Sequence, residues 1–404
     1  MLSYAVLKEN MPLSLRRGRV GLTDRGKERL FMKFSCDRNL LLAGLTVAAR
    51  AAAAKSPIPA LEGLLLTAGE DELVITGYNL KTGVRTRVPA DISEGGSIVL
   101  NARLFGDIVR KMSDSFLKLE ADASMLVKLS CGRSDFEIMG TNAEDFPELP
   151  TVEEENTFHI QEKKLKAMID QTIFAVSTNE SRPVHTGSLF EAEGKELTVV
   201  SVDGFRLALR REELEEDAGD QRISFVVPAP ALTEVGRIAG ADSEDSAAIH
   251  LGSRHILFTI GSSEVISRKL EGEFLDYRKS ISNTVKYDLL FQRRELLETF
   301  ERVSLVINEK YKSPVRCRFG DGAVTLTSAT ALGKATDVCP MKGSGEDLEI
   351  GFNNRFMLDA LRAAPVDELK LQLSSGSTPC VMVPGDGGDS FLYLVLPVRI
   401  RSEA

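Results

Sequence analysis

The chain has 404 residues, of which 43% are hydrophobic and 27% charged, and its formal net charge at pH 7 is −9. This length exceeds one ordinary domain, so we expect about two to four compact units, each with its own core. The composition excludes disordered and fibrous classes, and no apolar run reaches the roughly 18 residues that span a bilayer.

The cysteines indicate a reducing compartment. There are five, an odd number, and they form no C-x-x-C pair and have no histidine at metal-ligand spacing. We therefore expect a cytoplasmic protein with no metal and no cofactor.

Residues 1–31 differ from the rest, with seven Lys or Arg against three acids and no apolar stretch of a secretory signal. A helix-starting pattern follows directly after Met32. We expect Met32 to be the functional start, and segment 1–31 to be a disordered leader or an upstream-start extension.

One hairpin pattern occurs three times along the chain. Strand-like runs flank an acidic, glycine-containing turn at 64–76, 188–200 and 316–327, and corresponding positions are 124 and then 127 residues apart. Such a period predicts an architecture of repeated units.

Two amphipathic helices accompany each hairpin. Apolar residues at i, i+3, i+4 and i+7 predict an opening helix and a second helix in every unit, at 37–51 and 101–112, 161–176 and 228–238, and 292–307 and 353–363. Short alternating runs at 117–120, 249–251 and 369–373 read as strands.

Together these patterns predict an α+β fold of three similar domains, at 32–152, 157–280 and 283–404. The stretches 153–156 and 282–284 are the expected linkers.

Six segments stand in a fixed order along the chain: Met32–Ser35, Thr141–Leu149, Val202–Leu207, Glu271–Arg278, Asn308–Tyr311 and Leu396–Arg399. In this order and spacing they resemble the β subunit of bacterial DNA polymerase III, the sliding clamp family, over nearly all of residues 32–404. The resemblance implies a head-to-tail homodimeric ring of six clamp domains, with helices lining a channel for duplex DNA and sheets outside. It also implies a non-catalytic processivity factor that tethers the replicative polymerase, the clamp loader and repair polymerases through short peptide motifs.

A sliding ring needs weak, numerous, sequence-blind phosphate contacts, which Lys and Arg on helices can supply. Lys55 and Arg182 occupy positions where the resemblance implies channel-rim cations. The other DNA-channel candidates are chosen by helix membership alone, where a solvated helix face is an equally good explanation: Arg38, Arg50, Lys163, Lys166, Arg293 and Arg302.

The resemblance also implies an apolar pocket for partner peptides between the second domain and the C-terminal tail. Its expected lining is His185, Val202, Gly204, Phe205, Arg206, Leu207, Leu275, Lys279, Leu394, Val395, Leu396, Pro397, Val398 and Arg399. Ordinary core strands are the alternative explanation for these side chains. His185, Leu275, Lys279 and Ser280 depart from the family pattern, which leaves the peptide preference open.

The ring interface is expected between the first domain of one chain and the third of the other. Phe136 and Ile138, on one side of a strand, would face Leu305 and Val306. Core packing within each domain is the alternative.

No catalytic arrangement emerges from the sequence. The motif at 21–27 spells G-x-x-x-x-G-K, but Glu28 replaces the Ser or Thr that binds magnesium, and no strand precedes it. A nuclease using the acidic runs 213–217 or 242–245 is one competing hypothesis. The other is a clamp-fold paralogue that encircles nothing and acts as a protein-binding module.

Overall fold

The computed structural model describes residues 30–153, 155–281, 284–307 and 313–400. Residues 1–29 of the expected leader, Glu154 and 282–283 of the expected linkers, and the segment Asn308–Tyr311 lie outside the described residues. Strand β1 begins at Leu30, two residues before the predicted start of the fold.

The first domain is a mixed helix and sheet unit around its own apolar core. Asp37 Oδ1 caps its opening helix by accepting from the N–H groups of Asn39 and Leu40, at 2.7 and 3.0 Å. The elements are β1 (Leu30–Asp37), α1 (Arg38–Ala48), β2 (Gly63–Ala68), β3 (Glu72–Tyr78), β4 (Thr82–Pro89), β5 (Asp91–Glu94), β6 (Gly96–Asn101), α2 (Ala102–Lys111), β7 (Phe116–Asp122), β8 (Leu126–Cys131), β9 (Ser134–Met139) and β10 (Thr141–Asn142).

The second domain repeats this order around a second core. Its opening helix ends earlier than predicted, and a short 3-10 turn at Ile173–Ala175 follows. The elements are β11 (Asn156–Gln161), α3 (Glu162–Asp170), β12 (Gly187–Glu193), β13 (Glu196–Val202), β14 (Arg206–Glu213), β15 (Ile223–Pro228), α4 (Ala229–Ile238), β16 (Ser246–Leu251), β17 (His255–Ile260) and β18 (Ser263–Arg268).

The third domain has the same plan and a third core. Its elements are β19 (Tyr287–Gln292), α5 (Arg293–Ser304), β20 (Val315–Thr330), β21 (Gly333–Phe352), α6 (Asn354–Ala363), β22 (Glu368–Leu373), β23 (Cys380–Pro384) and β24 (Phe391–Val395). The predicted helices are thus present in all three domains.

The third predicted hairpin is wrong. The expected turn at 320–322 lies inside the continuous strand β20, and the ladder with β21 shifts register on both sides of Asp321. Gly322 adopts φ 70°, so the glycines serve β-bulges instead of a turn. The chain reverses ten residues later, at 331–332.

Backbone ladders join neighbouring domains. Strand β4 pairs with β18 and makes one nine-stranded sheet from the first two domains, and β14 pairs with β24 and makes one ten-stranded sheet from the last two. A third, five-stranded sheet ends at β9.

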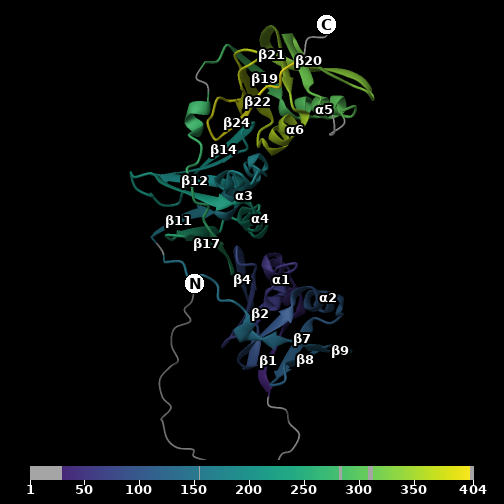
Figure 1. The fold of residues 1–404 in the computed structure, drawn as a ribbon, viewed down its shortest axis with the longest axis vertical. Helices are drawn as coiled ribbons and strands as arrows, with labels where there is room; N and C mark the ends of the chain where they lie inside the picture. The colour runs from purple at the N-terminus through teal and green to yellow at the C-terminus, as the bar shows by residue number, and fades with distance from the viewer. Residues whose placement is uncertain (1–29, 154, 282–283, 308–312, 401–404) are drawn as a thin grey trace, which may run out of the picture.

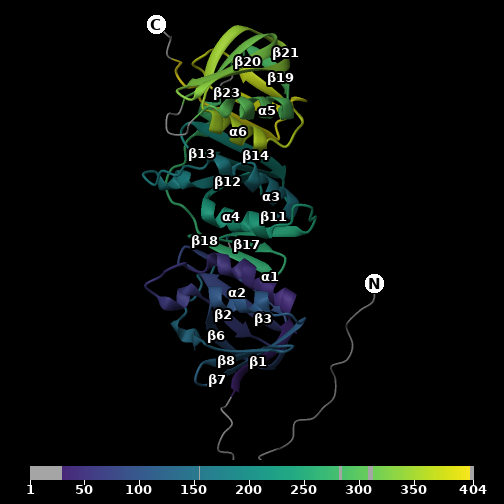
Figure 2. The same cartoon turned by 90° about the vertical axis from the view of Figure 1, so that its right-hand side faces the viewer.

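The six α-helices of the described ranges lie along one side of the elongated molecule. They lie toward the right in Figure 1 and face the viewer in Figure 2. In the second domain β11, β12 and β17 lie on the opposite side, whereas β7, β8 and β9 of the first domain reach the right-hand side near α2.

Candidate protein-binding pocket and nucleic-acid interface

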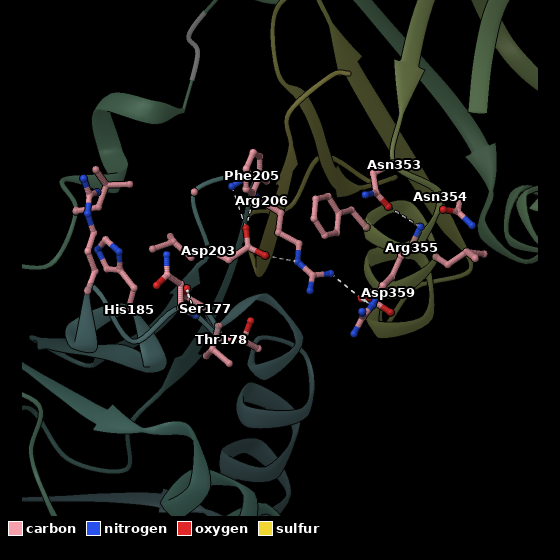
Figure 3. Close-up of a pocket in the computed structure, with 18 of the residues that line it drawn as sticks. Ser177, Thr178, His185, Asp203, Phe205, Arg206, Asn353, Asn354, Arg355 and Asp359 are labelled. Atoms are coloured by element: carbon pink, nitrogen blue, oxygen red, sulfur yellow. Dashed lines mark hydrogen bonds and ion pairs between the residues drawn. The ribbon is translucent and has the colours of Figure 1, made fainter. Parts of the chain in front are cut away.

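A cavity of about 1230 Å³ lies where the second and third domains meet (Figure 3). The second domain contributes the segment 176–185 and the turn between β13 and β14, and the third contributes the start of α6. Both domains therefore share this hollow.

The predicted second-domain wall and the C-terminal tail do meet. Leu207 on β14 is paired directly with Leu394 on β24, and both belong to one apolar cluster with Val202. Leu396 packs against that cluster, and its N–H donates to Phe205 O at 2.8 Å.

Several predicted pocket residues have other positions. Val395 is in the third-domain core, because successive residues of a strand face opposite sides of the sheet. The side chain of Lys279 is 84% exposed and its ammonium lies 2.9 Å from Asp276. Beyond the strand, Val398 N–H donates to Gly351 O at 2.8 Å, while Pro397 is half-buried and Arg399 exposed.

Arg206 mainly connects the second and third domains. Its guanidinium donates to Asp203 at 2.9 Å and to Asp359 of α6 at 2.6 Å, and it stacks over the rings of Phe174 and Phe356. The residue is only 8% exposed, so both carboxylates balance a charge that is nearly removed from water.

Three predicted residues present apolar or aromatic surface to the cavity. Phe205 is 62% exposed and stacks on Phe356 with ring centres 6.2 Å apart. It follows Gly204, whose φ of 89° turns the chain back toward β14. Leu275 and His185 face the same hollow from the second domain.

The α6 side of the cavity was not among the predicted pocket residues. Asn353 caps this helix through a 3.0 Å hydrogen bond from Arg355 N–H, and Phe356 and Asp359 line the hollow. Phe356 precedes the buried pair Met357 and Leu358, so an aromatic residue at the edge of an otherwise buried helix face was the available signal.

The α-helices carry more basic than acidic residues. The six α-helices of the described ranges contain thirteen Lys or Arg and eight Asp or Glu, whereas the whole chain has a net charge of −9. These helices are therefore net positive in an acidic chain.

The individual DNA-channel candidates differ in their surroundings. Lys55 and Arg182 are exposed and form no ion pair within the described part of the chain. Arg38 and Arg293 instead donate to carbonyls in the last turn of the second helix of their own domain, at Val109 and Leu361. The remaining candidates pair with nearby groups: Arg50 with Glu234, Lys163 with Glu244, Lys166 with Asp170, and Arg302 with Asp337.

The predicted ring-interface residues lie at the two ends of the molecule. Phe136 and Ile138 are on β9, an edge strand, and Phe136 is 38% exposed. Leu305 follows α5 and is 83% exposed, and Val306 is half-buried. Strand β20 forms the other outermost edge.

No group of three or more His, Cys, Asp or Glu side chains among the described residues could hold a metal ion. Of the helices in the described ranges, none is long and apolar enough to cross a membrane.

Family models cover the three domains in turn. The N-terminal, central and C-terminal domains of the DNA polymerase III beta subunit match residues 32–150, 159–276 and 281–399. The chain belongs to the DNA polymerase III beta subunit family.

Relatives and solved structures of this family match the chain over nearly their whole length. The Beta sliding clamps of Staphylococcus aureus and Halalkalibacterium halodurans are each 30% identical over 380 residues, which cover 91% of this chain and 99% and 100% of theirs. The Bacillus subtilis clamp superposes with a TM-score of 0.87 at 28% identity, over 92% of this chain and all of that one. A Pseudomonas aeruginosa clamp bound to griselimycin gives 0.86 at 27% identity, over 91% and 100%.

Proposed function

We propose that two copies of the protein close head to tail into a ring around duplex DNA and act as a sliding clamp, a non-catalytic processivity factor. The observation that carries this proposal is the placement of the six α-helices of the described ranges along one side of the molecule, with more basic than acidic residues in those helices of an acidic chain. Membership of the beta subunit family supports it.

The charge on this face suits sliding. Most of its cations share their charge with a neighbouring carboxylate, as Lys163 does with Glu244 at 2.6 Å. Such partly balanced groups bind phosphates weakly and carry no sequence information, so a ring can move along the duplex. Lys55 and Arg182 are the strongest individual candidates.

Two sheet edges support ring closure. Within the described residues, β9 and β20 are unpaired on one side, and β9 bears the exposed Phe136. Exposed apolar edge strands promote association. If β20 of each copy lay beside β9 of the other, the closed dimer would have two such interfaces, and both kinds of edge would be covered in each copy. Leu305 and Val306 would then contact Phe136 and Ile138.

The cavity between the second and third domains is the proposed docking site for short motifs of the replicative polymerase, clamp loader and repair polymerases. Val202, Phe205 and Leu275 give the cavity apolar surface beside its polar lining residues, and Val202 also belongs to the apolar cluster of Leu207 and Leu394. Such a site suits an extended peptide held by a few anchors. We expect griselimycin, which binds the Pseudomonas aeruginosa clamp, to occupy this cavity.

The proposed location is the cytoplasm. All five cysteines are buried and free, and burial raises the pKa of the Cys36 thiol to about 12. Unpaired thiols in the first and third domains suit a reducing compartment.

Electron microscopy of the purified full chain tests the ring directly. A six-lobed particle with an open centre is the expected result. Compact monomers without a hole would contradict ring closure and favour a clamp-fold protein-binding module.

A further inference from the structure

His185 lies in the wall between two hollows. It lines the large cavity and also a neighbouring one of about 430 Å³, which it shares with Phe274 and Leu275. Its backbone is held on both sides, because its N–H donates to Arg182 O at 3.0 Å and its carbonyl accepts from Ser177 N–H at 2.8 Å. The ring therefore has a defined place in the site (Figure 3).

An aromatic ring packs against His185. The Phe274 ring meets it nearly perpendicularly with centres 5.2 Å apart, and Val184 and Leu275 line the smaller hollow beside it. Neither nitrogen of His185 forms a hydrogen bond within the described residues, and Nε2 is enclosed without a partner. A polar group left in this state favours any ligand that supplies the missing bond.

The imidazole is neutral at pH 7. Burial lowers the pKa of His185 from its usual value, and the nearby Arg182 lowers it further. A neutral imidazole offers one N–H donor and one acceptor, so it can bind an amide or hydroxyl group but attracts no carboxylate through charge.

We propose that His185 is a specificity-determining residue of the pocket, which selects partner peptides carrying an amide or hydroxyl side chain (Asn, Gln, Ser or Thr) beside their apolar anchors. This inference rests on the proposed peptide-binding function. A site with an unpaired polar group rejects a ligand lacking the complementary group more strongly than an apolar wall rejects a ligand of altered size.

Selection from a phage-displayed heptapeptide library tests the proposal. The immobilised full-length proteins are wild type, His185→Leu, which removes both nitrogens, and His185→Gln, which keeps a donor and an acceptor. Peptides that also bind the Phe205→Asp variant are discarded, because their binding does not depend on the cavity. Phe205 is chosen because it is exposed, so its substitution does not disturb the core. Thermal unfolding checks that every variant is folded.

We expect wild type and His185→Gln to enrich Asn, Gln, Ser or Thr at one position, and His185→Leu to lose that enrichment. In calorimetry with the selected peptide, replacing this polar residue by Leu should weaken wild-type binding about tenfold and leave the His185→Leu affinity unchanged or improved.

The outcomes distinguish the role of His185 from the existence of the peptide pocket. The same residue preference in all three proteins would overturn the role of His185 and leave the pocket in place. A library with no peptide that distinguishes wild type from Phe205→Asp would contradict the proposed peptide pocket itself.

Discussion

Arg206 Nη1 lies 2.6 Å from Asp359 Oδ2 and links the second domain to α6 of the third. The same guanidinium holds Asp203, which accepts from the N–H groups of Phe205 and Arg206 at 2.9 and 3.0 Å. One nearly buried cation thus orders the turn that carries Phe205 and the helix on the far side of the cavity.

Asp359→Asn should weaken both the domain junction and the pocket. Removing this carboxylate leaves Arg206 with one ionic partner in a poorly solvated site, and we expect a loss of about 1–3 kcal/mol in urea unfolding with weaker griselimycin binding in calorimetry. Arg355→Gln is the matched control, since its exposed guanidinium approaches Asp359 only to 3.9 Å. Equal effects of the two substitutions would contradict the link.

Leu207→Asp should abolish griselimycin binding and leave the dimer intact, because it places a charge on the apolar wall opposite Leu394. Light scattering and calorimetry measure the two properties. Leu207 is only 3% exposed, so the surface variant Phe205→Asp provides the same test without a buried charge. Unchanged affinity in folded forms of both would show that the pocket is wrongly assigned.

Phe136→Asp should shift the protein from dimer to monomer, since it places a charge on the side of β9 that is proposed to contact Leu305 and Val306 of the second copy. Met139→Asp is the control, because Met139 lies on the same strand, is 65% exposed and points to the other side from Phe136 and Ile138. Sedimentation of all three proteins over a concentration series measures the change. A Phe136→Asp protein that remains dimeric would exclude this edge.

DNA association without a loader should be weak, independent of sequence and strongly salt-dependent. Replacing Lys55 and Arg182 together with Glu should lower the affinity further and reduce the slope of log K against log salt by about 1 for each lost phosphate contact. Fluorescence anisotropy with a short duplex measures both. Lys195→Glu, in the turn between β12 and β13, should change neither quantity, and tight or sequence-specific binding would argue against sliding.

Glu120 should stabilise the first domain only above acidic pH. Hydrogen bonds from Lys118 and Lys33 lower the pKa of this carboxyl, so its contribution is present above the unfolded pKa near 4.3 and is lost as pH falls through the folded value. Glu120→Gln should lower the urea midpoint by about 0.3 M at pH 7 and cause no difference near pH 2. An equal difference at both pH values would show that the ion pairs are not the cause.

Local patterns were sufficient for most of the fold. Apolar spacing located six helices to within a few residues, because each helix buries one stripe against its own sheet, and Asp37 and Asn101 cap two of them from the residue before the helix. The third hairpin failed because glycine and aspartate at 320–322 suit a bulge as well as a turn, and only the partner strand β21 distinguishes them.

The residues of the site depended far more on tertiary structure. The sequence by itself determined that three repeated units exist and that the segments 202–207 and 394–399 are apolar. It could not decide that Leu394 joins the apolar cluster of Val202 and Leu207 while Val395 joins the third-domain core, that Arg206 reaches Asp359, or that α6 lines the cavity. These facts depend on the pairing of β14 with β24, which brings together residues almost 190 positions apart, and periodicity along a chain carries no information about such a register.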